Sequence, residues 1–446
     1  MICEQFCSQE SCTQLSIQRK QIPMKPTIAL DQSLILTQHD EVVNLLLELT
    51  APPAPAVERA PLDIALVIDR SGSMQGEPMA AVRKAVLELI RVAGPQDRIA
   101  VVAFDSHIET VLPLAHHNID VVRRQIENVH SRGSTNLSGG WLEGCAILSN
   151  APLVAGRAPA IKRIVVLTDG HANSGIQNHD ELCTMTRGGI THGISTSMIG
   201  FANGHDETLL AGMADAGGGN DYWCAGPDQA LDVFNQEFAG LASVVAQNIS
   251  VAIQPTESTA AFEVLNEYDI INMPTVLGLQ KVVIGDACGD EVRRLVVRFT
   301  LRPRLLPGAF TIANLTVRWA STVGSIALHE TQIPVVVTAT DDNAEIREVD
   351  PRVTHHVLLL KVAKLRRDAI ALARHREIDE ARDLFNQAIA TLVAIGADPS
   401  EIHELVELAS RLEEFTERDM KAQYSTMRST NKGRKGRFDP NDPFNR

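Results

Sequence analysis

Apolar residues in the central part of the chain form short uninterrupted runs, and segments with a helical pattern separate these runs. Runs of this kind are typical of parallel strands that helices bury on both faces. The runs cover residues 62–68, 98–104, 161–167 and 194–200. The helical segments, several of which begin with Asp, Ser or Pro, cover residues 78–92, 120–129, 137–148, 206–214 and 227–247. This alternation predicts a doubly wound, Rossmann-like α/β domain over residues 61–247.

Strand patterns flank this domain on both sides. Residues 26–50 hold three short strand patterns, and a proline-rich linker follows at residues 51–60. After the α/β domain the helical period disappears, and β-rich runs separated by Gly and Pro predict an antiparallel β-sandwich over residues 248–345. These runs cover residues 276–284, 293–300, 310–319 and 332–338. We expect the strands before the linker to join this sandwich, so that the α/β domain is inserted between two parts of one β domain.

The carboxyl-terminal part of the chain is helical and then basic. Residues 350–424 carry the helical period in three segments and predict a helical bundle. These segments cover residues 353–375, 378–395 and 399–423. Residues 425–446 are rich in Lys, Arg, Gly and Asn and contain almost nothing apolar, so we predict a disordered basic tail.

The first 25 residues show no sustained period and predict a flexible arm. Three closely spaced thiols lie in it, Cys3, Cys7 and Cys12. Their spacing leaves a metal site open as an alternative to a reduced terminus, although no CxxC motif or paired His accompanies them.

Composition narrows the classes of partner. A chain of 446 residues has room for about three domains. Its formal charge of −14 is the wrong sign for coating nucleic acid or an anionic membrane, and a partner with carboxylates of its own would need a cation in between. No run approaches the roughly 18 apolar residues of a membrane span. The seven cysteines are odd in number and scattered, unlike a disulfide framework. We therefore expect a cytoplasmic protein without an integral membrane segment, and the oligomeric state stays open.

Polar side chains follow two of the predicted buried strands directly. Asp69, Ser71 and Ser73 come after the first strand, Asp169 comes after the third, and Thr135 lies in a small polar loop between them. The carboxyl ends of parallel strands meet at one sheet edge, where α/β proteins bind ligands. Carboxylate and hydroxyl oxygens suit Mg²⁺ or Mn²⁺. Each motif alone is more often a turn or a helix cap, but the three together in this order predict a metal site.

These motifs resemble the metal-ion-dependent adhesion site of von Willebrand factor A domains and integrin I domains. The matching residues are Asp69, Ser71 and Ser73 in Asp-Arg-Ser-Gly-Ser, Thr135 in Gly-Ser-Thr-Asn, and Asp169 in Leu-Thr-Asp-Gly. The resemblance implies that the three hydroxyls contact a divalent cation and that the two carboxylates act directly or through water. It also implies that the open coordination position takes a carboxylate from a partner protein.

The order of segments is similar to that of a group of bacterial and plant proteins with such a domain, in which β strands and carboxyl-terminal helices flank it. The plant members carry a zinc-binding RING that this chain lacks, so a ubiquitin-ligase role does not follow.

Enzyme classes find little support in the sequence. The chain has no GxxxxGK[ST] loop, no HExxH motif and no GxSxG elbow. The paired histidines His116, His117, His355 and His356 are adjacent in sequence and are expected at the surface or at helix caps. We therefore predict a non-enzymatic binding module. Three alternatives stay open: an accessory subunit of a MoxR-like or chelatase-like AAA+ ATPase, a metal-dependent phosphatase, and a metal that only staples the sheet edge.

Overall fold

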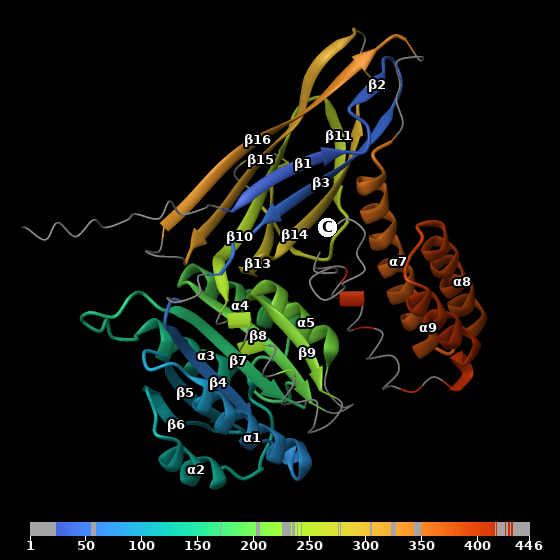
Figure 1. Ribbon diagram of the computed structural model, residues 1–446. Helices are drawn as coiled ribbons and strands as arrows, with labels where there is room; N and C mark the ends of the chain where they lie inside the picture. The colour runs from blue at the N-terminus through green and yellow to red at the C-terminus, as the bar shows by residue number, and fades with distance from the viewer. Residues whose placement is uncertain are drawn as a thin grey trace, which may run out of the picture.

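The fold is known from a computed structural model, which describes most of the chain from residue 24 to residue 414 and a few positions beyond. The described residues are 24–54, 59–169, 171–201, 206–224, 233, 237, 238, 240, 241, 243–274, 276, 278–303, 306–322, 327–342, 349–414, 416, 424, 427, 428 and 430. An α/β domain lies beneath a β domain, and helices pack beside both (Figure 1).

The α/β domain is built on a six-stranded sheet in the order β6-β5-β4-β7-β8-β9. Its strands are β4 (Leu62–Asp69), β5 (Arg98–Phe104), β6 (Ile108–Ala115), β7 (Ile161–Thr168), β8 (Ile194–Phe201) and β9 (Gly218–Cys224). All neighbouring pairs are parallel except β5 and β6. Side chains alternate between the two faces of a strand. Val165 of β7 therefore packs in one hydrophobic core, and Ile164 and Val166 pack in another on the opposite face.

Helices cover both faces of this sheet. They are α1 (Glu77–Val92), α2 (Ile119–Glu127), α3 (Leu137–Ser149), α4 (His179–Thr191) and α5 (Glu207–Ala216). The sequence pattern missed α4, whose Gly188 and Gly189 disfavour a helix. The helix predicted over residues 227–247 is wrong at its end, because strand β10 begins at Val244. Most of the rest of that segment lies outside the described residues.

The β domain consists of two sheets that share one hydrophobic core. One sheet has the order β1-β3-β14-β11, and the other has the order β12-β13-β10-β15-β16-β2. The bounds are β1 (Lys25–Leu30), β2 (Leu34–Leu36), β3 (Glu41–Thr50), β10 (Val244–Pro255), β11 (Thr259–Val264), β12 (Asp269–Asn272), β13 (Gln280–Cys288), β14 (Val292–Leu301), β15 (Gly308–Ser321) and β16 (Ala327–Thr340). All pairs are antiparallel except β2 and β16.

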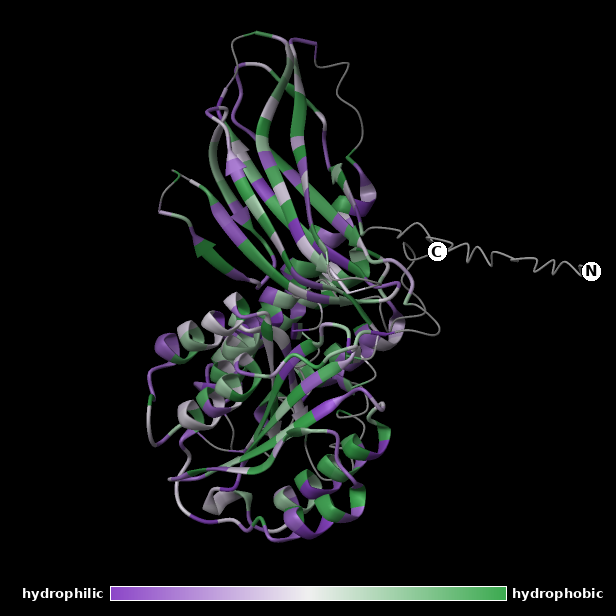
Figure 2. Cartoon of the chain, turned by 90° about the vertical axis from the view of Figure 1, so that its left-hand side faces the viewer, coloured by the Kyte–Doolittle hydropathy of each residue, from purple (hydrophilic) through white to green (hydrophobic). Residues whose placement is uncertain are grey.

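Strands from both sides of the α/β domain build these sheets together. β3, from before the linker, pairs along its whole length with β14. Many strands alternate in polarity because one of their faces packs in the core, and Figure 2 shows this alternation as purple and green bands. The strand predicted over residues 276–284 is shifted, because a turn with Gly278 at a φ of +74° precedes β13. β11 and β12 were not predicted, and they are short and partly exposed.

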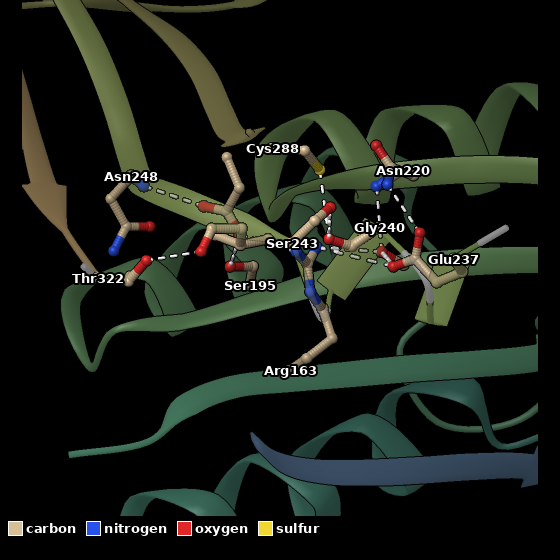
Figure 3. A network of polar contacts seen from close by, with 12 residues as sticks. Arg163, Ser195, Asn220, Glu237, Gly240, Ser243, Asn248, Cys288 and Thr322 are labelled. Carbon is tan, nitrogen blue, oxygen red and sulfur yellow. Dashed lines mark hydrogen bonds and ion pairs between the residues drawn. The ribbon is translucent and has the colours of Figure 1, made fainter. Parts of the chain in front are cut away.

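A buried polar junction joins the two domains (Figure 3). Arg163 of β7 donates to Asp286 of β13 at 2.7 Å, and both side chains are buried. The same carboxylate accepts from Ser195 of β8. Backbones also approach closely here, because a Cβ on Gly285 would lie 2.7 Å from the carbonyl oxygen of Gly218. The amino-terminal ends of β7, β8 and β9 therefore face the β domain.

The carboxyl-terminal helices are α7 (Pro351–Arg374), α8 (Ile378–Ala394) and α9 (Pro399–Ser410), followed by a 3-10 turn (Leu412–Glu414). α7 packs on the β domain through Val353 and Leu360 and on α8 along its second half. His356 of α7 is buried there, so its predicted surface position is wrong. The helix predicted over residues 399–423 is also wrong, because α9 ends at Ser410. None of the helices in the described part of the chain is long and apolar enough to cross a membrane.

The predicted terminal segments are covered only in part. β1 begins at Lys25, within the predicted arm, and Met24 is buried. Cys3, Cys7 and Cys12 lie outside the described residues. In the predicted tail, Met427 and Arg428 are buried, so the expectation of disorder is wrong at these two positions. The reason is that Arg428 pairs with two aspartates of the α/β domain and Met427 is apolar.

Candidate metal site

Two buried carboxylates meet where β4 and β7 end. Asp69 is the last residue of β4, and Asp169 follows β7 directly. The two strands are parallel neighbours, so their ends lie at the same sheet edge. Thr168 of β7 donates its hydroxyl to Asp69 Oδ2 at 2.5 Å, which fixes the orientation of this carboxylate.

Two serines link these carboxylates. The backbone N–H of Ser71 donates to Asp69 Oδ1 at 2.7 Å, and the hydroxyls of Ser71 and Ser73 lie 3.0 Å apart. Ser73 Oγ then donates to Asp169 Oδ1 at 2.8 Å. A short 3-10 turn (Gly72–Met74) after β4 brings the two serines onto the same side. Four of the five predicted residues therefore form one continuous hydrogen-bonded chain.

The fifth predicted residue, Thr135, is buried in the loop that precedes α3. This loop touches the serine turn, because the backbone N–H of Gly72 donates to the carbonyl of Gly133 at 3.2 Å. Gly133 has a φ of +69°, in the left-handed region that favours glycine. Asn173 accepts from the N–H of Thr135 at 2.7 Å. The loop, rather than a side-chain bond to the other four residues, brings Thr135 to the site.

The electrostatics of the site favour a cation. Burial raises the pKa of Asp69 to about 6, against hydrogen bonds from Thr168 and Ser71, and the nearby charge of Asp169 adds to this rise. Burial also raises the pKa of Asp169. A bound divalent cation would favour the charged form of both groups.

The donor set fits a hard divalent metal. It consists of carboxylate and hydroxyl oxygens, the ligand type of Mg²⁺ and Mn²⁺. Ser73 is exposed, whereas Asp69 and Ser71 are buried, so the set opens to solvent on one side. The described residues hold no group of three or more His, Cys, Asp and Glu side chains arranged for a metal. A metal here would therefore depend on the hydroxyls.

The site lies at the edge of the sheet that points away from the β domain. The amino-terminal ends of β7 and β8 contact the β domain through Arg163 and Ser195. Asp69 and Asp169 stand at the opposite, carboxyl-terminal ends of the strands. In Figure 1, β4 and β7 run side by side, with the β domain above them. The β domain therefore leaves the site open to a partner.

The sequence motif did not point to the residues that surround the site. Thr168 and Asn173 bond to the motif residues Asp69 and Thr135, and Arg70 bonds to Asp105. A signal for Asp105 was present, since it directly follows a predicted strand, as Asp69 does.

Comparisons with known proteins agree with this fold. Residues 63–235 match the family model of the von Willebrand factor type A domain. The fold resembles that of a von Willebrand factor type A protein from Catenulispora acidiphila, with a TM-score of 0.72, 16% identity and coverage of 91% of this chain and 96% of that one. It also resembles the ArnB paralog VWA2 from Sulfolobus acidocaldarius, with a TM-score of 0.64, 17% identity and coverage of 92% and 98%.

The curated relatives match a smaller part of this chain. The uncharacterized protein sll0103 of Synechocystis is 25% identical over 58% of this chain and 62% of its own length. Inter-alpha-trypsin inhibitor heavy chain H3 of Rattus norvegicus is 29% identical over 34% of this chain and 18% of its own length. The matches thus cover less than two thirds of these relatives. The chain contains a von Willebrand factor type A domain, a class of domain that commonly mediates protein interactions.

Proposed function

We propose that this chain is a non-enzymatic binding module that holds Mg²⁺ or Mn²⁺ at the candidate site and uses it to bind a carboxylate of a partner protein. The observation that carries the proposal is the hydrogen-bonded chain from Asp69 through Ser71 and Ser73 to Asp169. It gathers hard oxygen donors at an open sheet edge.

Each residue has a distinct part in this proposal. Ser71, Ser73 and Thr135 would offer hydroxyl oxygens to the cation, while Asp69 and Asp169 would supply charge directly or through water. Mg²⁺ prefers six oxygen ligands and keeps several waters, so an exchangeable position stays available. A partner carboxylate in that position would also resolve the mismatch between an acidic partner and a chain with a formal charge of −14.

The module class agrees with the comparisons at the level of the domain. Neither of the two functional alternatives, an accessory subunit of an AAA+ ATPase and a metal-dependent phosphatase, is favoured by the relatives.

The metal can be tested by calorimetry of the full chain with Mg²⁺ and Mn²⁺ after EDTA treatment. Asp69→Ala should abolish metal binding, because it removes the buried carboxylate that anchors the serine turn. Asp379→Ala is the matched control, because Asp379 lies on α8, away from the site, with its side chain 93% exposed. Equal metal affinity in wild type and Asp69→Ala would contradict the site.

Partner binding needs its own test. Peptides that contain a single Glu should bind the metal-loaded chain, and the corresponding Gln peptides should not. Binding of both kinds of peptide in EDTA would contradict a metal-bridged carboxylate.

A further inference from the structure

Asp105 lies beside the candidate site and is one of the most buried charged residues of the α/β domain. It directly follows β5, the neighbour of β4, and its side chain is 1% exposed. Its Oδ2 accepts from Arg70 Nε at 2.9 Å and from Arg132 Nε at 2.8 Å. Its Oδ1 accepts from the backbone N–H of His107 at 2.6 Å. One carboxylate therefore receives three donors, two of them from guanidinium groups.

The two arginine partners of Asp105 belong to the two loops that carry the proposed metal ligands. Arg70 stands between Asp69 and Ser71. Arg132 lies three residues before Thr135, and the N–H of Asn136, directly after Thr135, donates to the backbone carbonyl of Asp105 at 3.1 Å. Asp105 thus joins the serine turn to the threonine loop.

Backbone bonds run parallel to this connection. The N–H of Arg132 donates to the carbonyl of Arg70 at 2.7 Å, and the N–H of Gly72 donates to the carbonyl of Gly133 at 3.2 Å. Two backbone bonds therefore join the loops, and the ion pairs of Asp105 with Arg70 and Arg132 link them a third time through side chains.

The negative charge of Asp105 balances the positive charges of Arg70 and Arg132. Burial alone would raise the pKa of Asp105, but hydrogen bonds from Arg132 and His107 and the charge of Arg70 together hold it below the usual range. The side chain of Arg70 is buried, and its Nη2 has no hydrogen-bond partner among the described residues. Arg70 also donates to Glu109, whose side chain is 55% exposed. A neutral group at position 105 would leave the buried guanidinium with this exposed carboxylate alone and would remove the side-chain link between the two loops.

We propose that Asp105 is the positioning residue of the metal site, which fixes the spacing between the threonine loop and the serine turn without touching the metal itself. The inference rests on the proposed function. According to this proposal, Asp105 sets the distance between the two ligand loops, so metal affinity should fall when this carboxylate is neutralised.

The chain offers a matched control in Asp63 at the other end of the same sheet. Asp63 is also buried, and it also receives two guanidiniums, with Arg98 Nε at 2.8 Å and Arg157 Nη2 at 2.7 Å. It lies at the start of β4, away from the metal site. Asp63→Asn therefore removes an equivalent buried ion pair without altering either ligand loop.

Calorimetry of the full chain with Mg²⁺ and with Ca²⁺ tests the proposal. We expect Asp105→Asn to weaken Mg²⁺ binding by about ten-fold or more, as changes to residues behind metal ligands generally do. Ca²⁺ binding should weaken less, because Mg²⁺ demands near-octahedral geometry and Ca²⁺ tolerates irregular sites. Asp63→Asn should keep the wild-type affinity for both ions, although both variants should melt at a lower temperature.

A second variant covers the case in which Asp105→Asn does not fold. Arg132→Gln removes one donor whose side chain is 62% exposed, and it should weaken Mg²⁺ binding more than Ca²⁺ binding with little change in melting temperature. Wild-type Mg²⁺ affinity in Asp105→Asn, or in Arg132→Gln when the first variant is unfolded, would overturn the proposal while the loss of binding in Asp69→Ala still upheld the metal site. A wild-type chain that bound neither ion would overturn both.

Discussion

His356 should make the docking of α7 on the β domain sensitive to acid. This side chain is buried beside the cluster of Leu46, Val296, Val353 and Leu360 that joins the helix to the sheet. Burial, together with the positive charges of Arg294, His355 and Arg352, lowers its pKa from 6.5 to about 3. The folded chain therefore keeps this imidazole neutral at pH values at which the unfolded chain protonates it.

The sign and size of the effect follow from proton linkage. Below pH 6.5 the unfolded state binds a proton that the folded state does not, so the free energy of unfolding falls as the pH falls from 6.5 towards 3. One pKa unit corresponds to about 1.4 kcal/mol, so the complete shift corresponds to roughly 5 kcal/mol. Between pH 7 and pH 5 the linkage relation gives a loss of about 2 kcal/mol.

Urea unfolding measured by tryptophan fluorescence at pH 7 and pH 5 provides the assay, since Trp319 is buried in the core of the β domain. The wild type should lose about 2 kcal/mol more than His356→Leu between these pH values. His375→Leu, which changes an exposed residue at the end of α7, should behave like the wild type. The same pH dependence in wild type and His356→Leu would refute the reasoning.

Two further predictions concern contacts between parts of the chain. Gly285→Ala should lower the melting temperature, because Gly285 has a φ of +90° and its new Cβ would lie 2.7 Å from the carbonyl oxygen of Gly218. Gly156→Ala is the control for backbone strain alone, because Gly156 also has a positive φ but its new Cβ would have nothing within 4 Å. Arg428→Met should destabilise the chain by about 3 kcal/mol, because it removes a buried guanidinium that pairs with two aspartates. Deletion from Ser429 onward should leave the melting temperature unchanged. Equal melting of the two glycine variants, or of Arg428→Met and wild type, would contradict these assignments.

Local pattern was sufficient for strands in the middle of the α/β sheet, because both faces of β4 and β5 are buried and most of their residues are apolar. It failed for α4, where two glycines weaken the helical signal and tertiary packing overrides propensity. It also failed for β9, whose Gly-Gly-Asn-Asp start is polar because the strand lies at the sheet edge.

In the candidate site too, contacts between residues close in sequence could be predicted, whereas contacts between residues far apart in sequence could not. The motif placed Asp69, Ser71 and Ser73 within five residues, so their proximity could be predicted from strand and turn geometry alone. The role of these residues in metal binding stays a prediction. The junction could not be found in this way, because Arg163 and Asp286 are 123 positions apart and only the completed fold brings them together.

Both connections between the two domains leave the α/β domain at one end, and the site stands at the other. The chain enters at Leu62 as β4 begins, and it returns to the β domain at Val244. A partner that pulled on Asp69 would therefore load β4 along its own length. β4 is held by parallel neighbours on both sides, so its backbone hydrogen bonds would share that tension together rather than break one after another. A pull at this end of the domain would thus pass through β4 into the sheets of the β domain.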